Sequence, residues 1–318
     1  MGPRGDKGRH MLKREVLVER VPVPWATSFS RWLQSAMQQT WFYALGAVVL
    51  VIYVTPFLWM ILGSLRREVE IFQYTYPLTW HTFVPVEWSL KNFQDVLGIS
   101  PEGKSFGLNF GRALINTALV SAGVVASSLV FNTMGAYFFS RLDFPRKGFL
   151  LLFVIATMLI PFEAVMVPLY IVVRSLHLQD SYWALILPWY ASPFVIFALV
   201  QFFGEIPKEL DEAAIIDGAS HFGVLRHVIV PNAVPGLVTT ALLEFQFIWN
   251  LFYWPLIAVG SKELQTIQVA IAQQTTQTQV YWGRIFAGSV LASVPVILLF
   301  LAMQRYYVKG VVMSGLKG

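Results

Sequence analysis

The chain of 318 residues contains no cysteine, and only 13% of its residues are charged. The absence of cysteine excludes disulfide bonds, thiolate metal sites and a cysteine nucleophile. Soluble domains carry about 25% charged residues, so the low charge argues against a single aqueous core. Hydrophobic residues make up 56% of the chain and aromatic residues 15%, with a mean hydropathy of +0.59. This composition predicts an all-α polytopic membrane protein.

Positive charge is modest and unevenly placed. The formal net charge is +5, and basic residues gather near the ends of hydrophobic runs. Such clusters are typical of membrane orientation signals, because Lys and Arg are in excess on the cytoplasmic side, and they do not form a nucleic-acid surface. The short basic segments are the N-terminal region, 141–147 and 305–317. They predict a cytoplasmic N-terminus and a cytoplasmic C-terminus.

Hydrophobic runs near the ~20 residues that cross a bilayer predict six transmembrane helices. Their approximate bounds are 41–62, 113–139, 149–173, 183–203, 235–259 and 285–303. The pattern predicts a cytoplasmic N-terminal region (1–40), a transmembrane domain (41–306) and a cytoplasmic C-terminal tail (307–318). Within the transmembrane domain, it predicts an external loop at 64–110 and a cytoplasmic loop at 205–235.

The N-terminal region begins with a polar, basic segment and no apolar run follows it directly, so we expect no cleavable signal peptide. Aromatic and apolar residues then recur at helical spacing: Trp25, Phe29, Trp32, Leu33 and Ala36. Two interpretations remain open for this segment. It forms either a short helix at the membrane interface or a cytoplasmic helix that packs on the transmembrane bundle.

A polar stretch at 206–231 interrupts the hydrophobic runs and predicts a two-helix elbow. Pro207 suits a first helical turn, and Gly218 suits a left-handed C-terminal conformation. Ser220 is placed to cap a second short helix. Acidic residues near the start of the first helix suit its dipole: Glu209, Asp211 and Glu212. Apolar residues predict one buried face on each helix: Leu210, Ala213 and Ala214, then Phe222, Leu225 and Ile229.

Residues 98–105 match the phosphate-binding pattern G-x-x-x-x-G-K-[ST]. A true phosphate loop lies between a buried strand and a helix of an α/β domain. No β-rich run precedes this segment, the predicted topology places it outside the cell, and Pro101 removes an N–H that would bind phosphate. We therefore assign no nucleotide site here.

The third predicted span contains Glu163 between Pro161 and Pro168. The two prolines predict a kinked helix. An ionisable residue at membrane depth usually faces a bundle interior or a water-filled cavity. Glu163 therefore either lines or gates a pathway, or it satisfies backbone groups that the prolines free.

Three polar or aromatic residues fall on one face of the fifth predicted span: Gln246, Trp249 and Asn250. Unsatisfied polar groups that face lipid cost several kcal/mol each. These residues therefore face a translocation path or a partner subunit, or they form hydrogen bonds between helices. The role of Glu244 in the same span stays open.

The elbow also carries a spaced motif. Glu212-Ala213-Ala214 is followed after three residues by Gly218, and after nine more by 228–231, Val-Ile-Val-Pro. This spacing resembles the EAA loop of ATP-binding cassette (ABC) import permeases. Other segments are similar to the carbohydrate-type branch, which includes the smaller permease subunit of maltose transporters. They lie at 135–141, 161–163, 249–250 and 304–318. The resemblance runs from about residue 41 to the end, but the branch's Thr-Leu-Pro-Leu run appears as Thr-Ile-Gln-Val at 266–269.

The resemblance implies a type I importer permease architecture in a bacterial or archaeal plasma membrane. It implies two permease subunits, two ATPase subunits that bind ATP and Mg, and an extracytoplasmic sugar-binding protein. This chain would then bind no cofactor or metal and would carry no catalytic residue. The EAA loop would form a coupling helix that contacts an ATPase through six residues: Glu212, Ala213, Ala214, Asp217, Gly218 and Ala219.

The expected function is import of a sugar, a di- or oligosaccharide first, by alternating access. One alternative is import of glycerol-phosphate or another small polyol by the same mechanism. An ion-driven secondary transporter is a weaker alternative, because no inverted repeat or pair of broken helices is evident in the sequence. An intramembrane enzyme is disfavoured, because no Ser/His/Asp or paired-carboxylate arrangement converges at membrane depth.

Overall fold

The computed structural model describes residues 24–77, 79–276 and 279–315, with side chains from 38 to 304 within those ranges. The chain separates into two units, residues 1–57 and 58–318, which are described individually. The described residues form helices and no β-strand beyond a single bridge between Thr275 and Val280. This agrees with the predicted all-α class.

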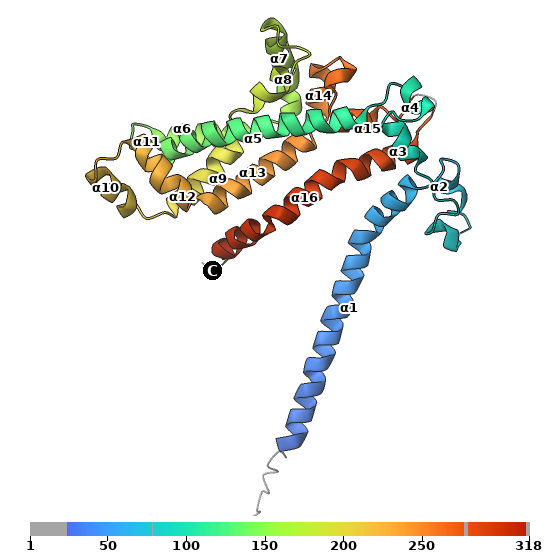
Figure 1. Cartoon of the computed structure of the whole chain (residues 1–318). Coiled ribbons are helices and arrows are strands. Elements are labelled where there is room, and N and C mark those ends of the chain that lie inside the picture. The colour runs from blue at the N-terminus through green and yellow to red at the C-terminus, as the bar shows by residue number, and fades with distance from the viewer. Residues whose placement is uncertain (1–23, 78, 277–278, 316–318) are drawn as a thin grey trace, which may run out of the picture. The chain divides into compact units, whose positions relative to one another are not determined.

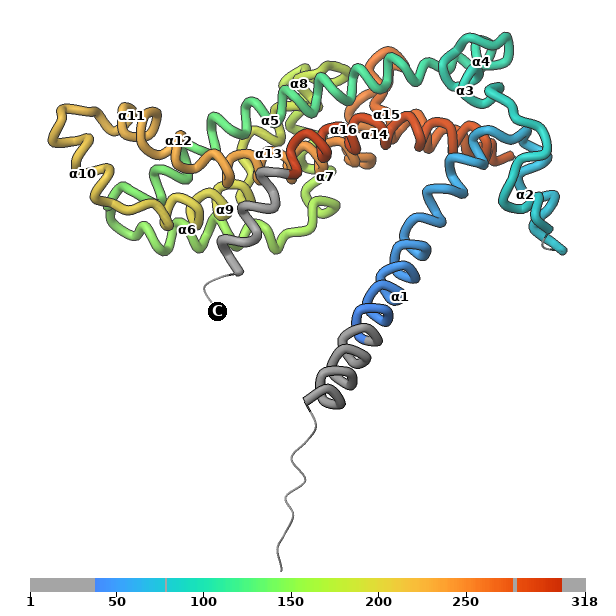
Figure 2. Tube along the Cα trace, turned by 60° about the horizontal axis from the view of Figure 1, so that its bottom comes forward, coloured from blue at the N-terminus to red at the C-terminus, as the bar shows by residue number. Residues whose placement is uncertain are grey.

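The helices follow one another with short connections, as Figures 1 and 2 show for the second unit. The longer helices are α1 (Pro24–Ser64), α5 (Phe110–Arg141), α6 (Lys147–Ala156), α7 (Phe162–Ser175), α9 (Pro193–Gly204), α10 (Glu209–Ile216), α13 (Val234–Trp249) and α16 (Trp282–Gly315). The shorter α-helices are α2 (Glu70–Gln73), α3 (Lys91–Val96), α4 (Pro101–Ser105), α8 (Tyr182–Ile186), α11 (His221–Val224), α12 (Val230–Asn232), α14 (Tyr253–Ala258) and α15 (Ile267–Ala272). Single 3₁₀ or π turns are η1 (Trp80–Thr82), η2 (Thr157–Leu159), η3 (Leu187–Trp189), η4 (Leu225–Ile229) and η5 (Lys262–Leu264).

Three uninterrupted segments are long and apolar enough to cross a membrane: 38–64, 110–141 and 282–304. They correspond to the first, second and sixth predicted spans. Three bent pairs also qualify, with bends of 98° between α6–η2 and α7, 43° between α8–η3 and α9, and 81° between α11–α12 and α13. The described residues therefore contain up to six spans by length and composition. α1 is continuous from Pro24, so no break separates the predicted N-terminal helix from the first span, and the side chains of that predicted helix lie outside the described residues.

Proline accounts for two breaks in the spans. Pro161 and the preceding Ile160 are extended, which separates η2 from α7, so the predicted kink is confirmed at Pro161, whereas Pro168 lies inside α7. The prediction of one continuous fifth span at 235–259 is wrong, because α13 ends at Trp249 and α14 is a separate short helix. Pro255 explains this break, since its ring in a continuous helix would collide with the carbonyl of Leu251.

The second unit is built on α5, which packs against α9 and α13, while α13 also packs against α16 (Figure 1). Three buried apolar clusters fill the contacts between these helices. One cluster joins α5 and α9 to the 206–231 elbow through Tyr137, Leu199 and Ile229. Burial of aliphatic and aromatic side chains, about 1.5–3 kcal/mol each, stabilises this arrangement.

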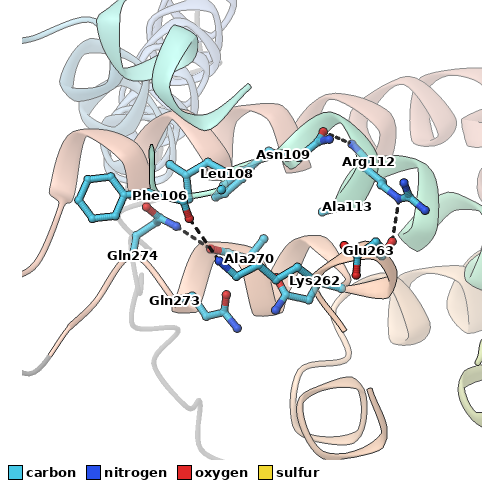
Figure 3. A pocket seen from close by; sticks show the side chains of 13 residues that line it. Phe106, Leu108, Asn109, Arg112, Ala113, Lys262, Glu263, Ala270, Gln273 and Gln274 are labelled. Carbon is cyan, nitrogen blue, oxygen red and sulfur yellow. Dashed lines mark hydrogen bonds between the residues drawn. The ribbon is translucent and has the colours of Figure 1, made fainter. Parts of the chain in front are cut away.

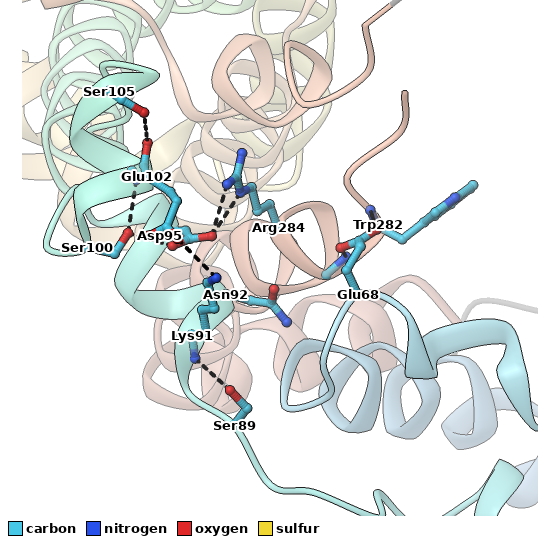
Figure 4. A network of polar contacts seen from close by, with 12 residues as sticks. Glu68, Ser89, Lys91, Asn92, Asp95, Ser100, Glu102, Ser105, Trp282 and Arg284 are labelled. Atoms are coloured by element: carbon cyan, nitrogen blue, oxygen red, sulfur yellow. Dashed lines mark hydrogen bonds and ion pairs between the residues drawn. The ribbon is translucent and has the colours of Figure 1, made fainter. Parts of the chain in front are cut away.

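The segment between α1 and α5 is held to the start of α16 by a polar network (Figure 4). Arg284 of α16 donates to Asp95 of α3 from Nε at 3.1 Å and lies 3.0 Å from it through Nη2. Glu68 accepts hydrogen bonds from the backbone N–H groups of Trp282 and Gly283, at 2.7 and 2.9 Å. The carboxylate thereby satisfies two free N–H groups at the N-terminus of α16, where negative charge is favoured.

The phosphate-loop pattern at 98–105 forms part of this network. Ser100 caps α4, accepting from the N–H of Gly103 at 2.9 Å and donating to Asp95. Gly98 takes a left-handed φ of 70°. Gly103 packs against α3 so closely that a Cβ atom there would lie 2.2 Å from the Asp95 carbonyl oxygen. The glycines and the serine of the pattern therefore serve the packing of α4 on α3.

We expect Gly103→Ala to lower the free energy of unfolding by about 1–3 kcal/mol, because the added methyl group overpacks against backbone that cannot turn aside. Thermal unfolding of the purified protein, followed by tryptophan fluorescence, measures the change. Gly148→Ala is the matched control, since a Cβ there meets no atom within 4 Å. Equal unfolding temperatures for the two variants would contradict the packing role of Gly103.

Candidate functional site

The elbow at 206–231 ends its first helix as the sequence predicts. α10 runs from Glu209 to Ile216, and Pro207 lies just before it. Gly218 has a φ of 90°. Its N–H donates to the carbonyl of Ile215 at 2.9 Å, and the N–H of Ala219 donates to that of Ala214 at 2.9 Å. These two bonds form a Schellman motif, which explains why glycine is suited to position 218.

The second helix of the elbow also begins as predicted, because the Ser220 hydroxyl accepts from the N–H of Gly223 at 3.2 Å. Its predicted apolar face is only partly correct. Leu225 and Ile229 are buried, but Phe222 is 62% exposed. Val224, which is fully buried, packs in the core in place of Phe222. The change of register follows from the π turn at Leu225–Ile229, which breaks the regular 3.6-residue period.

Asp211 is the buried residue of α10. The sequence instead predicted a buried apolar face made of Leu210, Ala213 and Ala214. Oδ2 of Asp211 lies 2.6 Å from Nε of Arg141 at the end of α5, and the two side chains are 11% and 4% exposed. Arg141 also donates from Nη2 to the carbonyl of Ile206 at 2.7 Å. Burial raises the pKa of the Asp211 carboxyl, and the Arg141 guanidinium opposes that shift. One arginine therefore fixes both the first helix of the elbow and the chain that leads into it.

The opposite face of the elbow is exposed and partly apolar. Leu210, predicted to be buried, is 45% exposed, and Ile216 is 84% exposed. Four of the six predicted coupling residues are exposed: Glu212, Ala213, Asp217 and Gly218. The remaining two, Ala214 and Ala219, are half-buried and pack against the core beneath. The elbow thus presents small, acidic and apolar groups together on one surface, while its buried groups hold it to α5.

The predicted pathway residues do not all lie together. Glu163, in the first turn of α7, is exposed, and its carboxylate makes no hydrogen bond with the described residues, so it does not satisfy freed backbone groups. Gln246 and Asn250 are exposed and line one hollow. Trp249 is separated from them, because it is 2% exposed and its Nε1 donates to the carbonyl of Ala292 at 3.1 Å. A pathway role for Glu163, Gln246 and Asn250 stays a prediction.

Glu244 of α13 is buried, and its carboxyl interacts electrostatically with Ser192 at the start of α9. Ser192 caps α9, and its backbone N–H donates to Oδ1 of Asn132 on α5 at 2.9 Å. Glu244 therefore belongs to a polar contact that joins three helices. Arg112 lies elsewhere, donating from Nε to the carbonyl of Glu263 at 2.9 Å.

The loop after α14 is fixed by polar side chains on two sides. Asp180 accepts from the backbone N–H groups of Gly260 and Ser261, at 3.2 and 2.9 Å. The Ser261 hydrogen bonds lower the pKa of the Asp180 carboxyl. On the other side, Arg112 and Lys262 flank a hollow of about 280 Å³ (Figure 3). Both cations bond backbone carbonyls there, so they brace the loop.

Long apolar helices, bent spans and an exposed elbow anchored on α5 define a multi-pass α-helical membrane protein of the permease class. Residues 132–312 match the family described as binding-protein-dependent transport system inner membrane component, and the chain belongs to this family. This confirms the resemblance drawn from the EAA spacing.

Similar proteins cover most of the chain. A probable ABC transporter permease protein of Bacillus subtilis is 32% identical over 83% of each chain. An arabinooligosaccharides transport system permease protein of Halalkalibacterium halodurans is 33% identical over 88% of this chain and 97% of its own. A trehalose/maltose transport system permease protein of Thermococcus litoralis is 30% identical, over 86% and 95%. The fold also matches a crystal structure of a bacterial ABC transporter for the acidic polysaccharide alginate, with TM-score 0.71, 20% identity and coverage of 86% and 98%.

Sequence reasoning missed two residues of the elbow's support. Arg141 was expected as a basic orientation signal and as part of the 135–141 segment that resembles the carbohydrate-type branch, and Asp211 as an acidic residue near a helix N-terminus. Many spans end with a basic residue, and many polar loops contain an acidic one. Such a combination therefore does not indicate that the two residues pair.

Proposed function

We propose that this chain is a permease subunit of an ATP-driven importer that moves a di- or oligosaccharide across a bacterial or archaeal plasma membrane by alternating access. Membership of the family supports the transport role. Relatives named for arabinooligosaccharide and trehalose/maltose transport support the sugar class. A second permease subunit, two ATPase subunits that hold ATP and Mg, and an extracytoplasmic binding protein would complete the importer.

The observation that carries this proposal is the elbow at 206–231. One side of the elbow is held to α5 by Arg141, and the other side is exposed. An ATPase subunit would contact its free surface at Glu212, Ala213, Ala214, Asp217, Gly218 and Ala219. Exposed Ile216 and Phe222 offer apolar area for the same contact, and contiguous exposed apolar groups often mark protein interfaces. Movement of the elbow would pass to α5 through the Arg141–Asp211 pair and then to α9 and α13, which pack on α5.

The proposed orientation places the elbow and both termini in the cytoplasm. Basic residues flank the spans on that side in the sequence, and the segments around α3, α4 and η5 would then face outward. Uptake into proteoliposomes that contain the complete complex tests the function. Uptake of trehalose, maltose or arabinotriose should require ATP and proceed without an ion gradient. Uptake driven by an ion gradient without ATP would contradict the proposal.

Gly218→Val should reduce ATP-driven uptake at least tenfold while membrane insertion is unchanged. A β-branched residue at a φ of 90° is strained by about 1–3 kcal/mol, so the end of α10 must rearrange. Apart from residues 217–219, no atom of the described residues lies within 4 Å of the added Cβ, so the described core is not disturbed. Gly204→Ala is the control, because its Cβ also meets nothing but its φ is not positive. Full uptake by the Gly218 variant would argue against elbow coupling.

A further inference from the structure

The segment between α1 and α5 presents aromatic side chains that the rest of the described chain leaves uncovered. Five of them lie at 72–88, here called the aromatic segment, and each is between 49% and 92% exposed: Phe72, Tyr76, Trp80, Phe83 and Trp88. Residues 72–86 contain no Asp, Glu, Lys or Arg. Single exposed apolar residues need no explanation, but several on one short segment mark a surface that makes a contact.

The backbone of the aromatic segment is fixed from beneath by two buried charged residues. Arg66 donates from Nη2 to the carbonyls of His81 and Thr82, at 3.0 and 2.8 Å. Glu70 accepts from the N–H of Val86 at 2.6 Å. These bonds satisfy backbone groups that would otherwise need water, so the segment can enter a less polar environment at a lower cost.

The aromatic segment is attached where two membrane spans end. α1 ends at Ser64, whose carbonyl accepts from the amide nitrogen of Asn92 at 3.0 Å. The ring of Phe72 lies 5.5 Å from the ring of Trp282, the first residue of α16, in an edge-to-face contact. Leu58 and Ile61, in the last turns of α1, are exposed as well, so apolar surface continues along the chain from the span toward the segment.

This position indicates which environment covers the rings. A span ends where the hydrocarbon core ends, so the headgroup and glycerol region of the bilayer lies at the level of Ser64 and Trp282. Trp and Tyr are enriched at that level, because each joins an apolar ring to one polar group. The polar groups of Tyr76, Trp80 and Trp88 form no hydrogen bond with the described residues, so they are free to bond lipid headgroups.

We propose that the aromatic segment is a lipid anchor, which lies in the headgroup region of the outer leaflet and holds the connection between α1 and α16 at the membrane surface. The inference rests on the orientation given under the proposed function, which makes 64–110 external. It requires neither a particular sugar nor coupling to ATP.

Cysteine labelling tests the anchor without background from this chain, because the chain contains no cysteine. Tyr76→Cys and Phe83→Cys replace exposed side chains and should fold. Each variant is labelled with a nitrobenzoxadiazole fluorophore and reconstituted with cysteine-free partner subunits in phosphatidylcholine vesicles. We expect phospholipids with a nitroxide high on the acyl chain to reduce the fluorescence about twofold, and nitroxides near the chain end to reduce it less.

Lys104→Cys is the control position, because this exposed residue of α4 belongs to the same external connection but lies outside the aromatic segment. Its label should lose almost no fluorescence to either lipid. Labels at 76 and 83 that resemble the label at 104 would overturn the anchor. A blue-shifted emission at 76 and 83 without quenching by lipid would also overturn it, because a protein surface would then cover the segment.

Ring removal tests whether the aromatic side chains themselves hold the segment at the membrane. With the label at 83, Tyr76→Ser/Trp88→Ser should remove at least about half of the lipid quenching, because two amphipathic rings are lost. Ile99→Ser is the matched control, since Ile99 is 63% exposed on the same connection but outside the aromatic segment. Quenching that is unchanged in the double variant would overturn the anchoring role.

ATP-driven sugar uptake by the unlabelled complex, measured in vesicles of the same composition, keeps the two proposals apart. Uptake in a complex whose labels show no lipid quenching overturns the anchor and leaves the import function standing. Lipid quenching in a complex that transports no sugar supports the anchor and counts against the import function.

Discussion

Arg141→Ala is expected to abolish ATP-driven uptake and to lower the free energy of unfolding by about 3–5 kcal/mol, because it leaves Asp211 buried without a cation. The pair is nearly enclosed, with exposed fractions of 4% for Arg141 and 11% for Asp211. The variant also loses the bond to the carbonyl of Ile206, at 2.7 Å, which leaves a second buried acceptor unpaired. The elbow would then be held to α5 by apolar contacts and by one long hydrogen bond, 3.4 Å between the Tyr137 hydroxyl and Nδ1 of His221.

The double variant Arg141→Ala/Asp211→Ala separates the effect of losing the ion pair from the effect of leaving one charge buried and unpaired. Removal of both partners leaves no unpaired buried charge, so the double variant should be more stable than either single variant. Its uptake should stay low, because the elbow has lost its buried ion pair with α5. Thermal unfolding measures the first effect, and the ratio of sugar transported to ATP hydrolysed measures the second. Normal transport in the double variant would show that the pair serves stability alone.

Local chemistry made much of the elbow predictable. Gly218 follows Asp217 after a helical run, and Ser220 precedes the next one, so the C-terminal motif and the N-cap both follow from neighbouring residues. The long apolar segments likewise predicted α1, α5 and α16, because their hydropathy depends on composition alone. Both kinds of inference require information from within about twenty residues.

Contacts between distant segments were not predictable in the same way. The helix dipole gives a sufficient local reason for an acid at position 211, so nothing in the sequence indicates that Arg141 pairs with it. Trp249 shows a second limit. At 3.6 residues per turn it lies on the side of Gln246 away from Leu243 and Phe247, and only the position of α16 decides that this side is buried.

The break in the fifth span was foreseeable in part. Pro255 lacks an N–H and crowds the carbonyl four residues earlier, which disfavours a continuous helix through Leu251. Pro161 imposes the same constraint, and the structure has the expected kink there. Hydropathy concealed the break near Pro255, because the residues on both sides of it are apolar. Their combined hydropathy resembles that of one long span.

Arg284→Ala is expected to lower the free energy of unfolding by about 3–5 kcal/mol, as for the elbow pair. The Arg284 side chain is 8% exposed, and its guanidinium lies 4.8 and 4.5 Å from the ring centroids of Phe106 and Tyr281 while it binds Asp95. Arg284→Lys should recover only part of this loss, because an ammonium group lacks the planar fork that Asp95 and the two rings contact. Thermal unfolding of the purified complex measures each variant.

The segment between α1 and α5 also offers a control ion pair. Arg67 pairs with Glu87 at 3.2 Å, but both side chains are more than half exposed. Arg67→Ala should therefore change stability by at most about 1 kcal/mol. Folded complexes of the Arg284 variant should retain their ratio of sugar transported to ATP hydrolysed, because Asp95 and Arg284 join α3 to α16 and do not contact the elbow. Breaking either buried pair, Arg141–Asp211 or Arg284–Asp95, would then lower stability. Only the loss of the Arg141–Asp211 pair would uncouple transport from ATP hydrolysis. Uncoupling by the Arg284 variant would instead place the α3–α16 contact in the transport cycle.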